Sequence, residues 1–287
     1  MRRRRCTSVV LSWRVQMQTV VRPSSLSGHV PIEESPWFSL GFFDDIIGFT
    51  GKQQDGIRPM ICREYQCLFV HVPKTAGQSV EQFFMDRLDL DWDADRDKVL
   101  LGDNDDPSRG TEKLAHLSAL EYLDCGFIPR EEFDGLFKFA FVRNPYERLV
   151  SEYRYRNYFH HRSFRDFVLN KLPEPGPDDK YRHVMPQYEM LHDGEGRQLV
   201  DFVGRFEKLQ ADFDEVCRQL GISDSALPHR NPSNKKSRNL KRKFRNALFM
   251  NGENDKRNYT DFYDDETLDA VSRLYRKDID TFGYSFG

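Results

Sequence analysis

Three features are scarce in this 287-residue sequence, and each absence excludes a class of protein. No stretch reaches the ~18 consecutive apolar residues of a membrane-spanning helix. The cysteines, which are Cys6, Cys62, Cys67, Cys125 and Cys217, form no CxxC pair, and this disfavours a disulfide scaffold or a zinc site. The formal net charge of −3 disfavours a general binder of nucleic acid or other polyanions.

The charge is spread unevenly along the chain. Residues 1–32 contain no acidic residue and include the run Arg2, Arg3, Arg4 and Arg5, which is typical of a transit peptide or of an unstructured start. We expect residues 1–60 to form a largely irregular tail and residues 61–287 to form the folded domain. A second basic run at 229–246 is read as a solvated loop, with a role near a cofactor or in steering an anionic substrate as the alternative.

From residue 66 onward, short apolar runs alternate with helical patterns. Strands are predicted at 67–72, 137–142 and 198–203, and helices at 79–88, 112–126, 145–160, 206–222 and 264–283. The first strand, CLFVHV, is apolar throughout, as expected of a strand covered on both faces. Strands that alternate with helices predict an α/β fold around a mostly parallel sheet. Length alone does not decide between one large domain and two small ones.

The turn after the first strand has the composition of an anion site. It reads PKTAGQS (73–79) and runs directly into a helix, whose free N–H groups and positive dipole end favour a negative ligand. Gly77 permits close backbone approach, while Lys74, Thr75 and Ser79 add donors. The lysine precedes the glycine, so this is not the GxxxxGK[ST] loop of nucleoside-triphosphate-binding proteins. The alternative reading is an ordinary turn with a surface lysine.

A second cation follows the next strand. Arg143 ends FKFAFV, and Ser151 follows about two helical turns later. A guanidinium and a hydroxyl at that place suit a second phosphate, although Arg143 could instead be a structural ion-pair partner. Two anion sites at adjacent strand ends predict a ligand with phosphates at both ends, such as a bisphosphorylated nucleotide.

The two segments together resemble a known family. FVHVPKTAGQS resembles the 5′-phosphosulfate loop, and FAFVRNPYERLVSEY the 3′-phosphate segment, of sulfotransferases that use 3′-phosphoadenylyl sulfate (PAPS). Segments 183–191, 201–216 and 263–286 also match in order. The closest branch contains the carbohydrate sulfotransferases of the Golgi and their bacterial relatives. The resemblance extends from about residue 66 to the end of the sequence.

This resemblance implies a P-loop-NTPase-like three-layer fold and transfer of a sulfuryl group from PAPS to an acceptor hydroxyl or amine, with a carbohydrate as the expected acceptor and no metal. By position, Lys74 would stabilise charge on the departing phosphate. The 5′-phosphate would be bound by the loop, namely Lys74, Thr75, Ala76, Gly77, Gln78 and Ser79. Arg143 and Ser151 would bind the 3′-phosphate.

The catalytic base is less clearly marked in the sequence. His116 matches the place where carbohydrate sulfotransferases often carry a catalytic histidine, and a base near the acceptor hydroxyl is required. His183 and Glu81 are the competing candidates. His71 is read as a packing or orienting residue, and His160 with the adjacent His161 as surface.

Two other functions remain open: a non-catalytic nucleotide- or glycan-binding protein of the same fold, and a P-loop-type kinase. Intact Lys74 and Arg143 disfavour the first, and the missing triphosphate loop disfavours the second. Because Golgi relatives begin with a membrane anchor and none is evident here, a cytoplasmic protein is expected. A Golgi-like or membrane-associated protein is the alternative if the N-terminus is incomplete. Acceptor identity depends on loops such as 171–197, which carry no readable motif.

Overall fold

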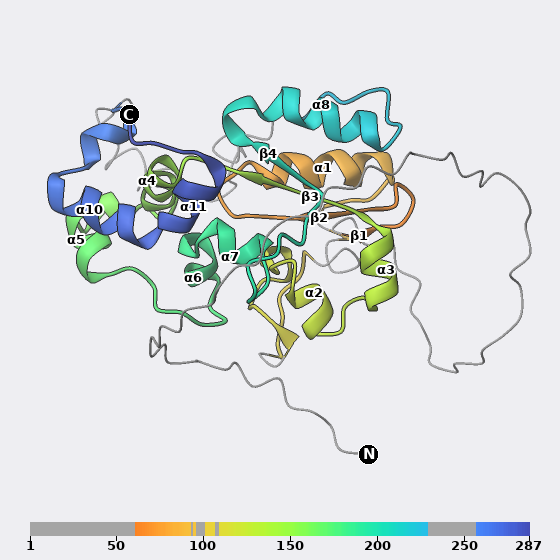
Figure 1. The fold of residues 1–287 in the computed structure, drawn as a ribbon, viewed down its shortest axis with the longest axis horizontal. Coiled ribbons are helices and arrows are strands. Elements are labelled where there is room, and N and C mark those ends of the chain that lie inside the picture. Colours follow the sequence, from red (N-terminus) through yellow and green to blue (C-terminus); the bar gives the residue numbers. More distant parts are fainter. Residues whose placement is uncertain (1–60, 93, 96–100, 107–108, 229–256) are drawn as a thin grey trace, which may run out of the picture. The chain divides into compact units, whose positions relative to one another are not determined.

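A computed structural model describes residues 61–92, 94–95, 101–106, 109–228 and 257–287 (Figure 1). Its sheet contains strands β1 (Ile61–Cys62), β2 (Cys67–Val70), β3 (Phe137–Val142) and β4 (Phe202–Arg205), in that spatial order. β1 is antiparallel to β2, and the remaining neighbours are parallel. The predicted α/β class with a mostly parallel sheet is therefore confirmed. Residues 1–60 and the basic run at 229–246, for which we predicted a tail and a loop, lie outside the described residues.

The third parallel strand begins later than the predicted 198–203. Gln198 pairs with His192 in an isolated bridge, and the ladder with β3 begins at Phe202, opposite Phe139. The backbone N–H of Asp201 donates to the Lys138 carbonyl at 2.7 Å and so sets this register. The shift matters for the site, because it brings Arg205 and Phe206 to the same sheet edge as the ends of β2 and β3.

Helices cover both faces of the sheet (Figure 1). On one face lie α1 (Gly77–Arg87) and α8 (Leu209–Gln219), whose Phe83 and Phe213 rings meet edge to face at 4.7 Å. On the other face lie α2 (Glu121–Asp124), α3 (Arg130–Gly135), α6 (Asp179–Val184) and α7 (Gln187–Leu191). The central strands β2 and β3 are therefore buried on both sides, which explains the apolar sequence of β2 and, apart from Lys138, of β3.

A second apolar cluster joins helices beyond the sheet edge. It combines α4 (Pro145–Tyr155), α5 (Phe164–Asn170), α10 (Asp265–Leu274) and α11 (Arg276–Phe282) with the short turns η4 (Tyr158–His160) and η7 (Tyr259–Phe262). Asn144 caps α4 ahead of Pro145, and Asp264 caps α10, so both predicted helix starts are confirmed. The predicted helix 264–283 is interrupted at Tyr275, whose backbone leaves helical geometry.

Three other predicted helices are also divided, and in the segment 145–160 helix α4 ends at Tyr155 and the turn η4 follows after the left-handed Asn157. The segment 112–126 forms only the turn η3 (Leu114–His116) and α2, because Leu117 is extended and the Ala119 N–H donates to Met190 rather than within a helix. The segment 206–222 forms the turn η5 (Phe206–Lys208) before α8. The break at Leu117 turns His116 away from α2. Among the described residues, none of the helices combines the length and apolarity needed to cross a bilayer.

Candidate active site

The loop between β2 and α1 is shaped by its own backbone. Lys74 and Ala76 both adopt left-handed conformations, with φ of 74° and 67°. The buried Thr75 hydroxyl donates to the Val72 carbonyl at 2.8 Å. That hydroxyl, expected from the sequence to face a ligand, therefore stabilises the turn. Gln78 is exposed and Ser79 is half-buried at the first turn of α1, and the N–H groups at a helix N-terminus favour a negative ligand.

Gly77 is required by a close approach rather than by its backbone angles. A Cβ at this position would lie 2.1 Å from Cδ2 and 2.2 Å from Nε2 of His71. Real Cβ atoms do not make such contacts, so the imidazole occupies the space that any side chain would need. His71 itself is buried, and its Nδ1 lies 2.6 Å from the Glu81 carboxylate in α1. His71, which contacts the loop at Gly77, is thus held in place by Glu81 of the helix that follows the loop.

Arg143 connects the two predicted anion sites. Its guanidinium donates to the Lys74 carbonyl at 3.3 Å and to the Glu147 carboxylate at 2.6 Å, and it lies 4.0 Å from the centre of the Phe206 ring. Its buried Nε has no hydrogen-bond partner among the described residues. A buried donor without a partner is unusual and favours a ligand acceptor there. Ser151 lies half-buried further along α4.

The buried Arg148, also on α4, ties the loop to α6. Its side chain, only 1% exposed, donates to the carbonyls of Pro73, Met185 and His183 at 3.0, 3.0 and 3.1 Å. Sequence reasoning did not single out this residue. A charged group satisfied by three backbone acceptors holds the loop and the end of α6 in one arrangement.

Three histidines lie in a row beside the loop, and each is paired with a carboxylate. The Nδ1 atoms of the three imidazoles lie 2.6 Å from carboxylate oxygens in the pairs His71–Glu81, His116–Asp179 and His183–Glu152. The His116 ring stands edge to face with the other two, at 5.0 Å between ring centres in both cases. The structure thus brings together all the candidate bases named from the sequence, whereas His160 and His161 are exposed, as predicted.

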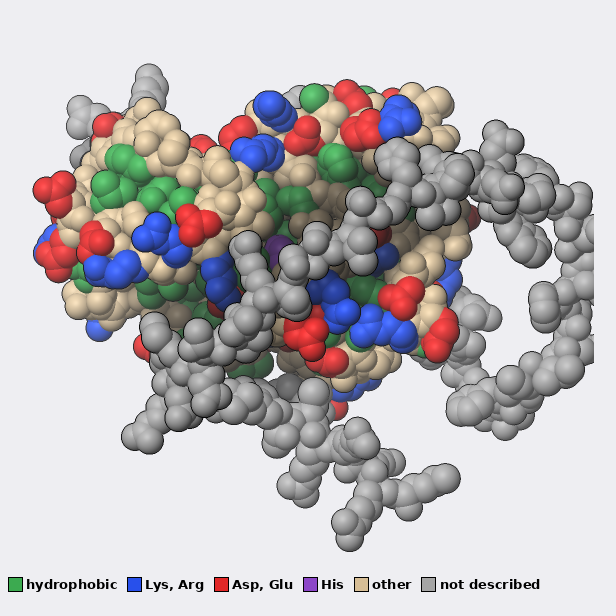
Figure 2. All heavy atoms as spheres, viewed as in Figure 1, with side chains coloured by type: hydrophobic (Ala, Val, Ile, Leu, Met, Phe, Trp, Pro, Cys, Tyr) green, Lys and Arg blue, Asp and Glu red, His purple; other side chains and the backbone are tan. Residues whose placement is uncertain are grey.

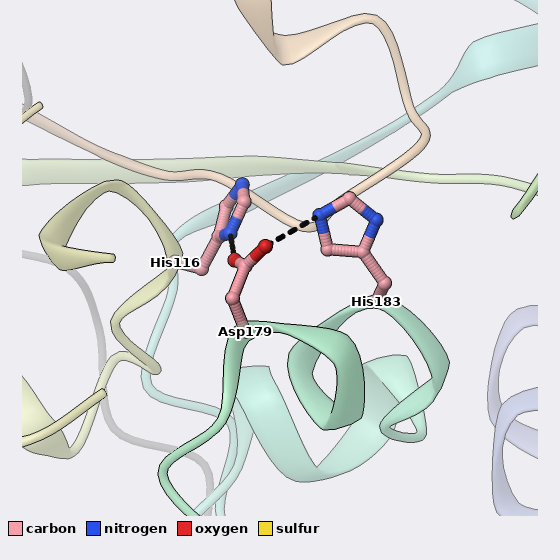
Figure 3. A group of neighbouring side chains, drawn as sticks. All are labelled: His116, Asp179 and His183. Atoms are coloured by element: carbon pink, nitrogen blue, oxygen red, sulfur yellow. Dashed lines mark hydrogen bonds and ion pairs between the residues drawn. The ribbon is translucent and has the colours of Figure 1, made fainter. Parts of the chain in front are cut away.

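Asp179 is the centre of this cluster (Figure 3). One carboxylate oxygen contacts His116 Nδ1, and the other lies 3.2 Å from the Arg156 guanidinium and 3.6 Å from His183 Nε2. Arg156 also donates to Glu152 at 2.7 Å, so Asp179, Arg156, Glu152 and His183 form a closed ring of ion pairs and hydrogen bonds. His116 is attached to that ring through Asp179.

Charge in the cluster is organised by burial and pairing. Burial lowers the pKa of His116 to about 3, against the opposing effect of Asp179. Burial would raise the pKa of Asp179, but the His116 hydrogen bond and nearby cations lower it overall. An ionised carboxylate can only accept, so the neutral His116 donates from Nδ1 and carries its lone pair on Nε2. The orientation therefore suits a general base.

Lys74 is also shifted. Burial, together with Arg143 and other nearby arginines, lowers the pKa of its ammonium group to about 8 despite the attraction of Glu152. Its Nζ lies 3.8 Å from the centre of the Tyr155 ring. The ammonium is therefore held between the anion loop and the histidine cluster, where it can follow a developing negative charge.

His116, Asp179 and His183 could also ligate a metal ion, since their nearest ligand atoms lie within 4.8 Å of one another. Both imidazoles already donate to carboxylates, and Arg156 already neutralises Asp179. Each charge in the cluster thus has a protein partner, and the arrangement suits an oriented base.

On the face seen in Figure 2, basic and acidic side chains of the described residues are interspersed.

Four residues of the site were not found from the sequence: Arg148, Glu152, Arg156 and Asp179. Two spacings carry a partial signal, because Glu152–Arg156 and Asp179–His183 are both four residues apart on a helix. Nothing in those spacings, however, indicates that one pair lies against the other. Asp179 lies near the end of the proline-rich segment 171–180, which belongs to the loops at 171–197 on which acceptor identity was expected to depend.

Comparison of the sequence with known protein families identifies the family of this chain. Residues 58–285 match the sulfotransferase family, and the chain therefore belongs to that family of transferases. A relative in Archaeoglobus fulgidus, described only as an uncharacterized protein, is 30% identical over 101 residues, which is 34% of this chain and 78% of that protein. No solved structure gives a significant match.

Proposed function

We propose that this protein transfers the sulfuryl group of PAPS to a hydroxyl group of a carbohydrate. The observation that carries the proposal is the contact between the two anion-binding segments: Arg143, at the end of β3, donates to the backbone of Lys74, after β2. The phosphosulfate would lie on the loop at residues 74–79. The 3′-phosphate would be bound by Arg143, whose buried Nε lacks a partner among the described residues, and by Ser151.

The residues of the cluster divide the chemical work. The acceptor oxygen attacks sulfur, and His116 Nε2 takes the proton that this oxygen loses. Asp179 holds the His116 ring and stabilises the imidazolium that forms. The bond between sulfur and the bridging oxygen breaks, its electron pair stays on the departing phosphate, and Lys74 stabilises that charge. No redox partner is needed.

His116 is preferred over its two rivals because of its surroundings. The Glu81 side chain is 2% exposed and already pairs with His71, and the His183 side chain is 7% exposed and lies between Glu152 and Asp179. The His116 side chain is 13% exposed, and no bond of its Nε2 is needed to hold the ring. Its partner Asp179 leaves that nitrogen available to a substrate.

Calorimetric titration with 3′,5′-bisphosphoadenosine and with AMP tests the donor assignment. We expect the bisphosphate to bind at least ~30-fold more tightly, since one charge-assisted phosphate contact contributes about 2 kcal/mol. Arg143→Gln is expected to remove most of that preference, whereas Arg197→Gln, at an exposed surface arginine, is expected to leave it unchanged. Equal affinity of the wild-type protein for both nucleotides would refute the assignment.

A second experiment tests the acceptor. Labelled PAPS is supplied with a panel of glycans, simple phenols and a tyrosine peptide, and the labelled product is identified. Transfer to glycans is expected. Transfer only to the phenol or the peptide would refute the carbohydrate acceptor but keep the sulfotransferase, and binding without any transfer would favour a non-catalytic protein.

A further inference from the structure

Tyr155, the last residue of α4, has an unusually exposed aromatic ring. Among the described residues it is one of two large hydrophobic residues that are exposed, at 52% for Tyr155 and 41% for Leu274. An isolated exposed aromatic residue needs no explanation by itself. The neighbours of this ring do need an explanation, because they are the residues to which the proposed chemistry is assigned.

Three groups of the site lie against the Tyr155 ring, and one of them, the Arg156 guanidinium, is 5.6 Å from the ring centre and is held by Glu152 and Asp179. The ammonium of Lys74 lies 3.8 Å from the ring centre, a short cation–π contact. The imidazole of His183 is stacked against the same ring at 5.6 Å and an interplanar angle of 22°. The ring therefore lies between the lysine assigned to the leaving group and the cluster that holds the base.

The contacts that Lys74 and His183 make with the Tyr155 ring differ in how easily they can change. His183 is fixed at Nδ1 by Glu152, and its carbonyl accepts from the buried Arg148. Lys74 has a flexible four-carbon side chain, and no ion pair fixes its ammonium among the described residues. A ligand that needed the ring would therefore displace the lysine and leave the histidine in place.

The chemistry of the ring identifies such a ligand. The face of an aromatic ring is negative, and it attracts an ammonium for the same reason that it attracts electron-poor C–H groups. The C–H-rich face of a pyranose is therefore a natural competitor of Lys74 for the face of Tyr155. A sugar stacked there would take the place of Lys74 on the ring, while His183 stays stacked on the same tyrosine.

We propose that Tyr155 is the platform on which the acceptor sugar stacks, and that this stacking releases Lys74 from the ring to the leaving phosphate. The inference rests on the proposed sulfotransferase function and adds a residue that selects the acceptor. Without an acceptor, Lys74 stays partly on the ring and stabilises the departing phosphate less. Attack by water, which would break the same sulfur–oxygen bond and give free sulfate, is then slower.

Tyr155→Leu removes the aromatic face at an exposed position, and Tyr155→Phe retains it. For Tyr155→Leu we expect the KM of the glycan acceptor to rise about three- to thirtyfold, the range spanned by single cation–π-type contacts, with kcat within about threefold of wild type. Release of sulfate from PAPS in the absence of acceptor should rise about threefold or more. Tyr155→Phe should resemble wild type in all three measurements, as should Leu274→Ala, which shortens the other exposed apolar side chain.

Two results would overturn the inference. One is equal acceptor KM for the Leu and Phe variants, and the other is unchanged acceptor-free sulfate release in Tyr155→Leu. Titration with 3′,5′-bisphosphoadenosine separates these failures from failure of the function. If wild type binds the bisphosphate and transfers sulfate while the Leu variant behaves like Phe, only the platform is refuted. If wild type binds no bisphosphate, both proposals fall.

Discussion

The anion loop and the histidine cluster lie side by side, but they are built in different ways. The loop is a run of consecutive residues, and the groups that we propose bind the phosphosulfate are mainly backbone N–H groups at the start of α1. The cluster is assembled from side chains of the β2 end, α1, η3, α4 and α6, and the carboxylate that contacts each histidine Nδ1 is ten or more residues away in sequence. A site made by one local turn is readable from a short motif. A site made by several elements depends on how they pack.

The largest expected effect separates the two regions by their function. His116→Ala is expected to lower kcat about 10²- to 10⁴-fold, the usual contribution of general acid–base catalysis, while affinity for 3′,5′-bisphosphoadenosine stays within about threefold. Steady-state kinetics and calorimetry measure the two quantities. His161→Ala, at an exposed position, is the matched control. Wild-type turnover of the His116 variant would remove it as the base and leave His183 and Glu81.

The second prediction concerns the residue that joins the two regions. Arg148→Met keeps the bulk of the side chain but leaves the carbonyls of Pro73, Met185 and His183 without their buried donor. We expect the free energy of unfolding in urea to fall by about 3–5 kcal/mol, since each orphaned buried group costs about 1–3 kcal/mol. The exposed Arg165→Met serves as control, with an unchanged urea midpoint expected. An equally stable Arg148 variant would contradict the structural role.

The third prediction tests the contact between the loop and the first histidine. Gly77→Ala places a methyl group about where the His71 ring lies, so the loop must shift. Affinity for 3′,5′-bisphosphoadenosine is expected to fall about tenfold or more, equivalent to at least ~1.4 kcal/mol. Gly135→Ala, whose new Cβ would meet nothing within 4 Å, is the control.

A double-mutant cycle makes the same prediction sharper. If the clash with His71 is the cause, Gly77→Ala should be less harmful in a His71→Ala background, because the space is then open. Strictly additive losses would show that the glycine acts through something other than the imidazole. His71→Ala by itself leaves the Glu81 carboxylate buried without its partner, so its own effect is measured separately.

The smallest expected effect is on the pH profile. Protonated Lys74 is needed to stabilise the leaving phosphate, and the pKa of Lys74 is lowered to about 8. The kcat/KM for PAPS, which reports groups of the free enzyme, should therefore fall as pH rises above about 8. The burial that lowers the pKa of His116 to about 3 keeps this base neutral, so it should cause no loss between pH 5 and 7. In Lys74→Arg the alkaline fall should disappear, because a guanidinium stays charged. An unchanged alkaline limb would assign it to another group.

The sequence alone predicted much of this protein, and the reason is local physics. The strand at 137–142, the helix starts near residues 145 and 264, and the turn between β2 and α1 follow from burial pattern, capping chemistry and turn composition within a few neighbouring residues. The predicted helix at 112–126 failed because its competing bonds, such as that from Ala119 to Met190, are made to a distant segment. The same long-range bonding decided where β4 begins.

Tertiary structure alone decided the arrangement of the histidines. The sequence offered His116, His183 and Glu81 as bases but did not show which groups surround each of them. The partners are distant in the chain, since Asp179 is 63 residues from His116 and Glu152 is 31 residues from His183. Tyr155 is an ordinary helix residue in the sequence, and only packing brings it to Lys74 and His183. Backbone geometry is encoded by neighbours in the chain, so the turn from β2 into α1 could be predicted. The orientation and charge of a buried imidazole depend on the partners that folding brings to it.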